Sequence, residues 1–271
     1  MNDPTVSQQI SPEQLRFEKE HRKFHRFIRI SRILLLLLFL STWEYTARTG
    51  LIDSFFFSSP SGICLCFLEM LKTKELLSHI GVTLLETVCS FFLVLFLSLG
   101  TATLLWSSAK LSGILEPYLV ILNSLPKSAL APLLIVWLGT GIRTIITAGI
   151  SVAVFGAVIS LYTVFLQADS QKLLLIRTLG GNRKDCFFKV VLPSSVPVIL
   201  STMKVNIGLA LVGVIIGEFL AARRGLGYLI IYASQVFQLD MLITSILILC
   251  GIALGLYQII QLAEHAYRKR A

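Results

Sequence analysis

Residues 144–166 read TIITAGISVAVFGAVISLYTVFL, and residues 241–263 read MLITSILILCGIALGLYQIIQLA. Neither stretch contains a charged side chain. A helix needs about 20 consecutive apolar residues to cross the hydrocarbon core of a bilayer. These two stretches therefore predict membrane-spanning helices, and they place the chain among the all-α integral membrane proteins.

Four further apolar stretches accompany these two. The sequence predicts about six transmembrane helices, at residues 33–49, 80–106, 115–139, 144–166, 196–222 and 241–263. The charged residues inside them are few: Glu44, Arg48, Glu86, Glu116, Lys127, Lys204 and Glu218. Charged residues make up 14% of the chain and hydrophobic ones 55%, whereas about 25% of the residues of a soluble domain are charged. This composition excludes a water-soluble protein, and no segment between the spans is long enough for a soluble domain.

The third span is the least regular of the six. Pro117, Pro126 and Pro132 fall within residues 115–139. Proline lacks the backbone N–H and clashes with the preceding turn, so it kinks or breaks a helix. We therefore expect this span to be interrupted.

The distribution of Lys and Arg predicts the orientation, because cytoplasmic loops are enriched in these residues. With the N-terminus inside, the basic residues concentrate in the tail 16–32, in the loop 172–189 and at the C-terminus. Residues 1–32 are then a cytosolic basic tail, residues 33–271 are the transmembrane domain, and both termini are cytoplasmic. The net charge of +9 follows from this topology and does not require a nucleic-acid partner.

The sequence contains none of the common catalytic or nucleotide-binding motifs. It has no GxxxxGK[ST] phosphate loop, no HExxH, no GxSxG, and no GxGxxG after a strand. Its five cysteines form no CxxC pair, so neither a zinc site nor a disulfide framework is indicated. We expect no catalytic residue, cofactor or metal in this chain. It is not an enzyme, which leaves a channel, a transporter or a membrane scaffold.

The segment between the fourth and fifth spans, DSQKLLLIRTLGGNRKDCFFKVVLPSSVP at 169–197, carries its own structural signals. Asp169 or Ser170 can cap a short helix that ends at Leu179, and Gly180-Gly181 can make a left-handed turn. Asn182 with Asp185 can cap a second helix, and Pro193 suits the start of the next one. The cytosolic loop 167–195 is thus predicted to hold two short helices. Their apolar side should cover a protein partner or lipid, and it comprises Leu173, Leu174, Ile176, Phe187 and Phe188.

Three motifs in this order resemble a known family. IRTLGG followed by VVLPSSVP resembles the second half of the EAA loop of binding-protein-dependent ABC importer permeases. LPKSALAPLLIVWLGTGI at 125–142 and GEFLAARRGLGYLI at 217–230 resemble the nitrate, sulfonate, taurine and thiamine-precursor branch of that family. The chain departs from the pattern at residues 174–176, where Leu-Leu-Ile stands in place of Glu-Ala-Ala.

The resemblance implies an ABC type I importer permease fold and several partners. These are two copies of an ABC ATPase, an extracytoplasmic solute-binding protein, a second permease copy in a homodimer, and membrane lipid. The solute would be a small anion, such as a sulfonate or nitrate, or a thiamine-type precursor. The positions carried over as ATPase-coupling residues are Arg177, Thr178, Leu179, Gly180, Gly181 and Pro193.

The charges inside the spans are functional candidates, because a charge in lipid is costly. Lys127 and Lys204 could attract an anionic solute to the pore, or extend to the cytosolic face. Glu86, Glu116 and Glu218 are interpreted as extending to the interface. An alternative function is an ion-coupled secondary transporter in which Glu86 or Glu218 carries a proton.

Overall fold

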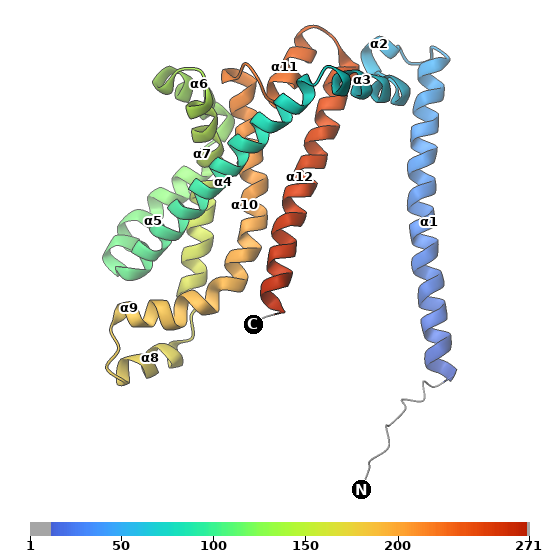
Figure 1. The fold of residues 1–271 in the computed structure, drawn as a ribbon. Coiled ribbons are helices and arrows are strands. Elements are labelled where there is room, and N and C mark those ends of the chain that lie inside the picture. Colours follow the sequence, from blue (N-terminus) through green and yellow to red (C-terminus); the bar gives the residue numbers. More distant parts are fainter. Residues whose placement is uncertain (1–11, 270–271) are drawn as a thin grey trace. The chain divides into compact units, whose positions relative to one another are not determined.

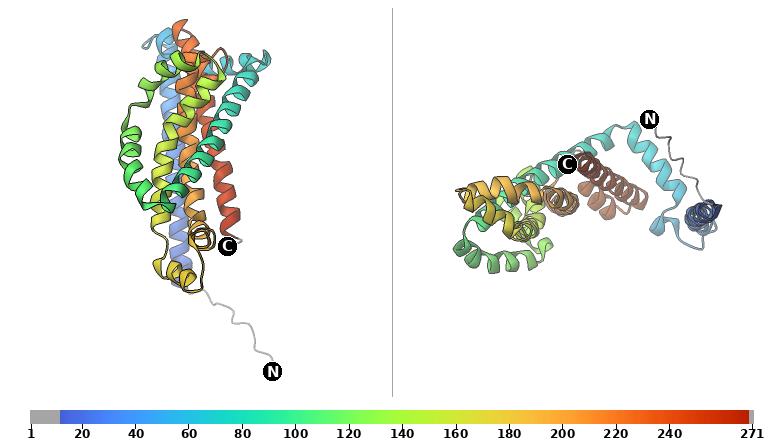
Figure 2. Two further views of the ribbon diagram at one scale, coloured as in Figure 1. Left: turned by 90° about the vertical axis from the view of Figure 1, so that its left-hand side faces the viewer. Right: turned by 90° about the horizontal axis from the view of Figure 1, so that it is seen from below.

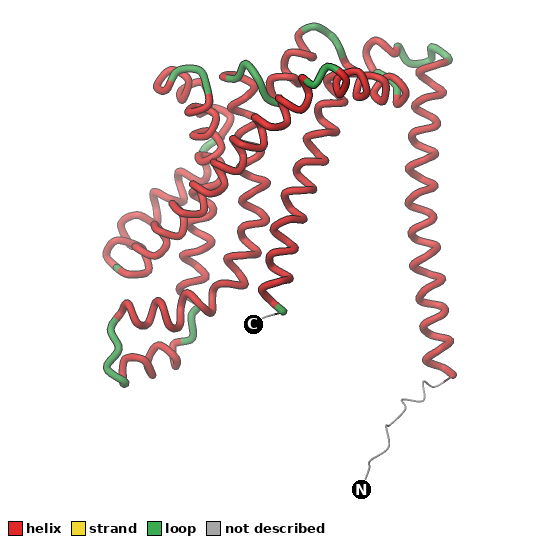
Figure 3. The backbone as a smooth tube through the Cα atoms, viewed as in Figure 1, coloured by secondary structure: helices red, strands yellow, loops and turns green. Residues whose placement is uncertain are grey.

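The computed structural model describes residues 12–269, and every regular element in that range is a helix (Figures 1 and 3). The helices are α1 (Pro12–Arg48), α2 (Ser54–Phe57), α3 (Pro60–Lys72), α4 (Glu75–Ser107), α5 (Ala109–Ser124), α6 (Lys127–Leu138), α7 (Ile142–Leu166), α8 (Ser170–Thr178), α9 (Arg183–Cys186), the π-helix η1 (Phe187–Val191), α10 (Leu192–Ala221), α11 (Leu226–Gln235) and α12 (Leu239–Arg268). The chain divides into two compact units, residues 1–62 and 63–271, which are described separately.

The first unit is dominated by α1. This helix joins the second half of the basic tail and the first predicted span into one element of 37 residues. Its leucines at 34–38 are all more than half exposed. Apolar side chains around the whole circumference of a helix are typical of a helix in lipid. At the end of α1, the Glu44 carboxylate pairs with Arg48 and accepts hydrogen bonds from Ser61 N (3.1 Å) and Ser61 Oγ (2.9 Å).

The core of the second unit is formed by α4, α7 and α10, which pack against one another. Two glycines of α10 allow a close approach to α7. A Cβ atom at Gly213 would lie 2.7 Å from Gly149 Cα, and one at Gly217 would lie 2.9 Å from Ile145 Cα. Small residues let helix backbones approach in this way inside a membrane protein. The GxxxG pair of α10 therefore serves packing within the subunit.

Four helices in the described range are long and apolar enough to cross a membrane. They are α4, α7, the continuous α9-η1-α10 segment and α12, and the α5–α6 pair makes a fifth if it counts as one broken span. These match the five predicted spans from residue 80 onward. The span predicted at 33–49 lies in α1, which is not one of these helices, so that span stays a prediction.

The break in the third span occurs at one of its three prolines. α5 and α6 meet at an angle of 98°, and Pro126 lies in the gap between them. Pro117 and Pro132, by contrast, lie inside α5 and α6, and the helices continue through them. The expected interruption is confirmed, but only Pro126 produces it.

The second unit has two distinct ends. α8, α9 and the end of α12 lie at one end (Figure 1, and Figure 2, left). The start of α4, α11 and the loop 222–227 lie at the other. The basic segments 172–189 and 268–269 share the first end, as the predicted orientation requires.

Candidate functional site

The loop predicted to be functional begins with α8, and each of its local signals is confirmed. Asp169 is the N-cap, and its side chain accepts a hydrogen bond from Gln171 N (2.9 Å). Gly180 has φ +82°, the left-handed conformation that glycine adopts without strain. Gly180 N–H donates to Arg177 O (3.0 Å) and Gly181 N–H to Ile176 O (2.9 Å), the pair of bonds that closes a Schellman motif. The Leu-Gly-Gly sequence therefore ends α8 and reverses the chain.

The second helix of the loop starts as predicted and then continues further. Asn182 and Asp185 form a capping box, with reciprocal hydrogen bonds of 3.0 and 2.9 Å. α9 does not end as a separate short helix, because η1 joins it directly to α10. Pro193 lies in the first turn of α10, as expected, and it is exposed.

The predicted apolar side of the loop is only partly correct. Leu173 and Phe187 pack into the core of the unit, and Ile176 is half-buried. The apolar side chains that remain exposed are those of Leu174 (62%), Leu175 (58%), Leu179 (75%) and Phe188 (64%). We call these four residues the coupling patch, after the role that the sequence resemblance predicts for this loop. Arg177, Thr178 and Gly180 are exposed beside it.

A set of contacts that the sequence did not indicate fixes the loop to the membrane helices. Phe187 is 6% exposed, and its ring centroid lies 5.4 Å from those of Trp106 on α4 and Phe165 on α7. Arg183 Nη2 donates to Trp106 O (3.3 Å), and its guanidinium lies 5.7 Å from the Trp106 ring centroid. The loop is therefore packed directly against the ends of α4 and α7.

Both candidate pore lysines have partners within the chain. Lys127 Nζ donates to Leu122 O (2.6 Å) and Asn123 O (2.9 Å), so it caps the last carbonyls of α5. Lys204 Nζ lies 2.5 Å from Glu264 Oε2, and its side chain is only 16% exposed. Neither lysine is a free charge in this conformation.

The interpretation that span carboxylates extend to the interface is wrong for two of the three. Glu86 and Glu218 are 2% and 1% exposed, and they lie in the same buried cluster between α4 and α10. Glu116 is exposed. The sequence gives no signal for this pairing, because the two carboxylates come from different spans.

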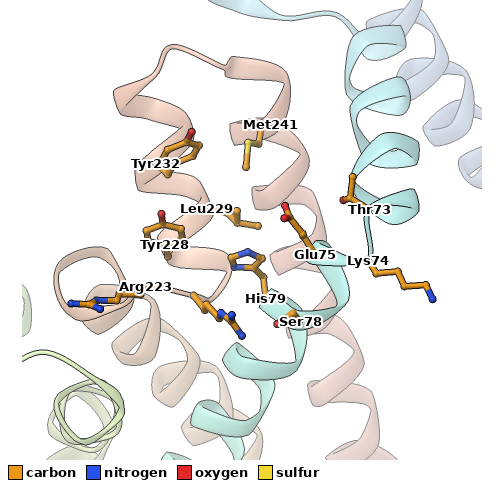
Figure 4. Close-up of a pocket in the computed structure, with 11 residues that line it drawn as sticks. Thr73, Lys74, Glu75, Ser78, His79, Arg223, Tyr228, Leu229, Tyr232 and Met241 are labelled. Carbon is orange, nitrogen blue, oxygen red and sulfur yellow. The ribbon is translucent and has the colours of Figure 1, made fainter.

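The end opposite the coupling patch carries a pocket of about 500 Å³ between the start of α4 and α11 (Figure 4). The rings of His79 and Tyr228 stack at its centre, with their centroids 6.0 Å apart. Lys74 and Arg223 lie at its opposite edges and point outward in Figure 4. Among the residues whose side chains the structure describes, none forms an ion pair with Lys74, Arg223 or Arg224. The three cations form a basic rim rather than a site for one ion. Within the same range, no three His, Cys, Asp or Glu side chains are placed to hold a metal.

Comparisons with known proteins identify the family of this chain. Residues 94–269 match the family model described as a binding-protein-dependent transport system inner membrane component. The chain is 31% identical to a probable ABC transporter permease protein of Haemophilus influenzae over 242 residues, 89% of this chain and 98% of that protein.

Relatives with named solutes are more distant. The taurine transport system permease protein TauC of Escherichia coli is 25% identical to this chain. The match includes 80% of this chain and 81% of TauC. The formylaminopyrimidine transport permease protein ThiX of Halalkalibacterium halodurans is 25% identical, with coverage of 72% of this chain and 77% of ThiX.

A solved structure shows the same fold. The inward-facing MetNI methionine ABC transporter matches with a TM-score of 0.65 at 18% identity, over 72% of this chain and 97% of the other. At this identity the likeness concerns the fold alone. The extent of the family match, together with the Haemophilus relative, decides the assignment: the chain is an ABC transporter permease and belongs to the family of binding-protein-dependent transport system inner membrane components.

Proposed function

We propose that this chain is the membrane-spanning subunit of an ABC importer, and that a separate subunit hydrolyses the ATP. The coupling patch carries the proposal. It exposes four large apolar side chains on a loop that is anchored to α4 and α7 through Phe187. Exposed apolar clusters of this kind mark protein interaction sites. An ATPase that moves this loop would thereby move the transmembrane helices.

The proposed assembly contains two permease copies, two ATPase copies and an extracytoplasmic solute-binding protein. The loop end of the second unit, with residues 172–189 and the end of α12, would face the cytoplasm of the plasma membrane. The binding protein would dock at the opposite end, where the basic rim of Lys74, Arg223 and Arg224 lies. Acidic side chains on the binding protein would complement this rim.

The proposed solute is a small organic anion such as a sulfonate, or a thiamine-type precursor. This rests on the names of the taurine and formylaminopyrimidine relatives. The test is a ligand screen on the binding protein that acts with this permease. Binding of taurine, an alkanesulfonate or a pyrimidine precursor supports the proposal, and selective binding of an amino acid or a sugar contradicts it.

The docking role of the coupling patch can be tested with a matched pair of variants. Leu179 and Leu51 are almost equally exposed, at 75% and 74%, and lie in different parts of the chain. We expect Leu179→Asp to abolish co-purification of the ATPase subunit, because a carboxylate would be buried in an apolar contact. Leu51→Asp should retain the ATPase. Retention by both variants would show that the ATPase does not bind this patch.

An ion-coupled secondary transporter is the alternative, and the burial of Glu86 beside Glu218 favours it. Uptake in vesicles separates the two functions. Uptake that depends on ATP and on the ATPase subunit supports the importer. Uptake that needs neither and collapses with a protonophore supports the secondary transporter.

A further inference from the structure

The start of α11 is held by side chains from α4. The first backbone N–H groups of a helix have no partner within the helix itself. Here Gly225 N–H donates to His79 Nδ1 (2.9 Å), and Leu226 N–H donates to Thr83 Oγ1 (2.8 Å). His79 and Thr83 are four residues apart, on one face of α4. They bind successive amides of the loop that connects α10 to α11.

Glu218 completes this anchor from α10. One carboxylate oxygen, Oε2, accepts from Gly227 N–H, and Tyr228 N–H also donates to the carboxylate. The other oxygen, Oε1, accepts from Thr83 Oγ1 at 2.7 Å. Three protein donors therefore converge on a side chain that is 1% exposed. Both oxygens of this carboxyl group therefore act as hydrogen-bond acceptors.

The two glycines of the loop follow from the position of this carboxylate. A Cβ atom at Gly225 would lie within 2.5 Å of the Glu218 carboxylate atoms, and one at Gly227 would lie 2.8 Å from Glu218 Cβ. Gly225 also has φ +125°, which L side chains rarely adopt. Glycine at both positions therefore allows the backbone to pack directly against the Glu218 side chain.

Glu86 adds a second carboxyl group to the same cluster. It is 2% exposed, and its carboxyl group lies close to that of Glu218. Its Oε2 atom is buried and receives no hydrogen bond from an N–H or O–H donor in residues 12–269. An ionised carboxylate can only accept hydrogen bonds, so this oxygen would be unsatisfied if Glu86 carried a negative charge. A proton on Glu86 removes the difficulty, because Glu86 then becomes the donor.

We propose that Glu86 and Glu218 form a proton-binding site that holds one proton on Glu86, and that this proton allows Glu218 to anchor the start of α11. Two ionised carboxylates that are both almost fully buried would repel each other strongly. With the proton in place, Glu86 donates to Glu218 and adds no charge. Glu86 is thus a positioning residue for the outer loop, acting through Glu218.

The other titratable groups around the pair are few. On α4 these are Glu75 and His79, whose Nδ1 lies within hydrogen-bond distance of both the N–H (2.9 Å) and the carbonyl oxygen (3.1 Å) of Gly225. Arg223 and Arg224 line the neighbouring pocket of about 440 Å³ that also contacts Glu86, and Tyr228 lies on α11. The α7 residues of that pocket, Ile142 and Ile145, carry no titratable group. Loss of the proton is accordingly assigned to the carboxyl pair.

Infrared spectroscopy of the full-length permease in lipid tests the proton directly. A buried protonated carboxyl gives a C=O stretch that is separate from the carboxylate bands and exchanges slowly in deuterated water. We expect this band in the wild-type protein at neutral pH and its loss in Glu86→Gln. The matched control is Glu116→Gln, which changes an exposed span carboxyl and should keep the band. Absence of the band in the wild type, or its persistence in Glu86→Gln, overturns the proposal.

Hydrogen exchange of the amides at 225–228 tests the anchoring role. Protection, corrected for the intrinsic rate, should be present at neutral pH and fall as the pH rises through the point where Glu86 ionises. Glu86→Gln keeps a donor of the same shape and should stay protected with no pH dependence. Glu86→Leu has no donor and should lose protection at every pH. The same pH profile in the wild type and in Glu86→Gln would show that the proton does not hold the loop.

Discussion

At the scale of single residues, Gly180 and Gly181 serve the turn after α8 for different reasons. Gly180 has φ +82°, and a Cβ atom added there would meet no other atom within 4 Å, so its constraint is conformational. A Cβ atom at Gly181 would lie 2.5 Å from Ile176 Cγ2 and 2.7 Å from Ile176 O, so its constraint is steric. Asparagine tolerates the left-handed region, but no residue with a Cβ avoids a backbone oxygen at 2.7 Å.

We expect Gly180→Asn to keep the ATPase bound, with a loss of stability of about 1 kcal/mol or less. Gly181→Ala should open the turn and strongly reduce co-purification of the ATPase subunit. A bulky β-branched residue at Gly180, such as valine, should have the same effect, because it cannot adopt φ +82° without strain. Normal association of Gly181→Ala would mean that the Schellman turn is not needed for docking.

Local contacts of single residues could be predicted from the sequence, but contacts between distant residues could not. The caps at Asp169 and Asn182 and the left-handed Gly180 could be predicted, because each is decided by residues within a few positions in the chain. The hydrogen bond from Thr83 to Glu218 joins residues 135 positions apart, and no local pattern indicates it. Lys204 and its partner Glu264 on α12 are also far apart in the sequence, so no local pattern indicates that pair either.

At the scale of elements, Phe187 connects the loop 167–195 to α4 and α7. It follows directly after α9, and the neighbouring Phe188 points outward and is 64% exposed. The sequence analysis assigned Phe187 and Phe188 to the same apolar side of the loop because both are hydrophobic. The structure separates them, because consecutive residues of the π-helix η1 point in different directions. One ring belongs to the core and the other to the coupling patch.

We expect Phe187→Ala to keep the ATPase bound but to abolish stimulation of ATP hydrolysis by the solute-loaded binding protein. Removing a buried aromatic ring costs about 3–5 kcal/mol and leaves a cavity between the loop and the helices. Phe187→Leu should restore most of the stimulation, which separates loss of coupling from misfolding. Phe188→Ala should instead weaken ATPase binding. Identical behaviour of Phe187→Ala and Phe188→Ala would contradict the separate roles.

At the scale of the whole chain, hydropathy predicted the helices from residue 80 onward because each of them, apart from the broken α5–α6 pair, is a long apolar run. It did not predict which faces of those helices meet, since nearly every residue of a spanning helix is apolar. The orientation rests on Lys and Arg, and the structure places the basic loop 172–189 and the end of α12 together. α3 and the loop 222–227 should then face the outside.

The two cysteines of α3 allow this orientation to be tested. Cys64 is exposed, whereas Cys66 is half-buried and hydrogen-bonds Thr244. Burial raises the pKa of the Cys66 thiol above its usual value, so less of it is thiolate at neutral pH.

In intact cells, a membrane-impermeant maleimide should label Cys64 quickly and Cys66 slowly. Cys64→Ser should remove the fast phase, and raising the pH should speed the slow one. Cys186 is buried on the opposite side and should not react. Fast labelling seen only in inside-out vesicles would reverse the proposed orientation, and with it the assignment of the coupling patch to the cytoplasm.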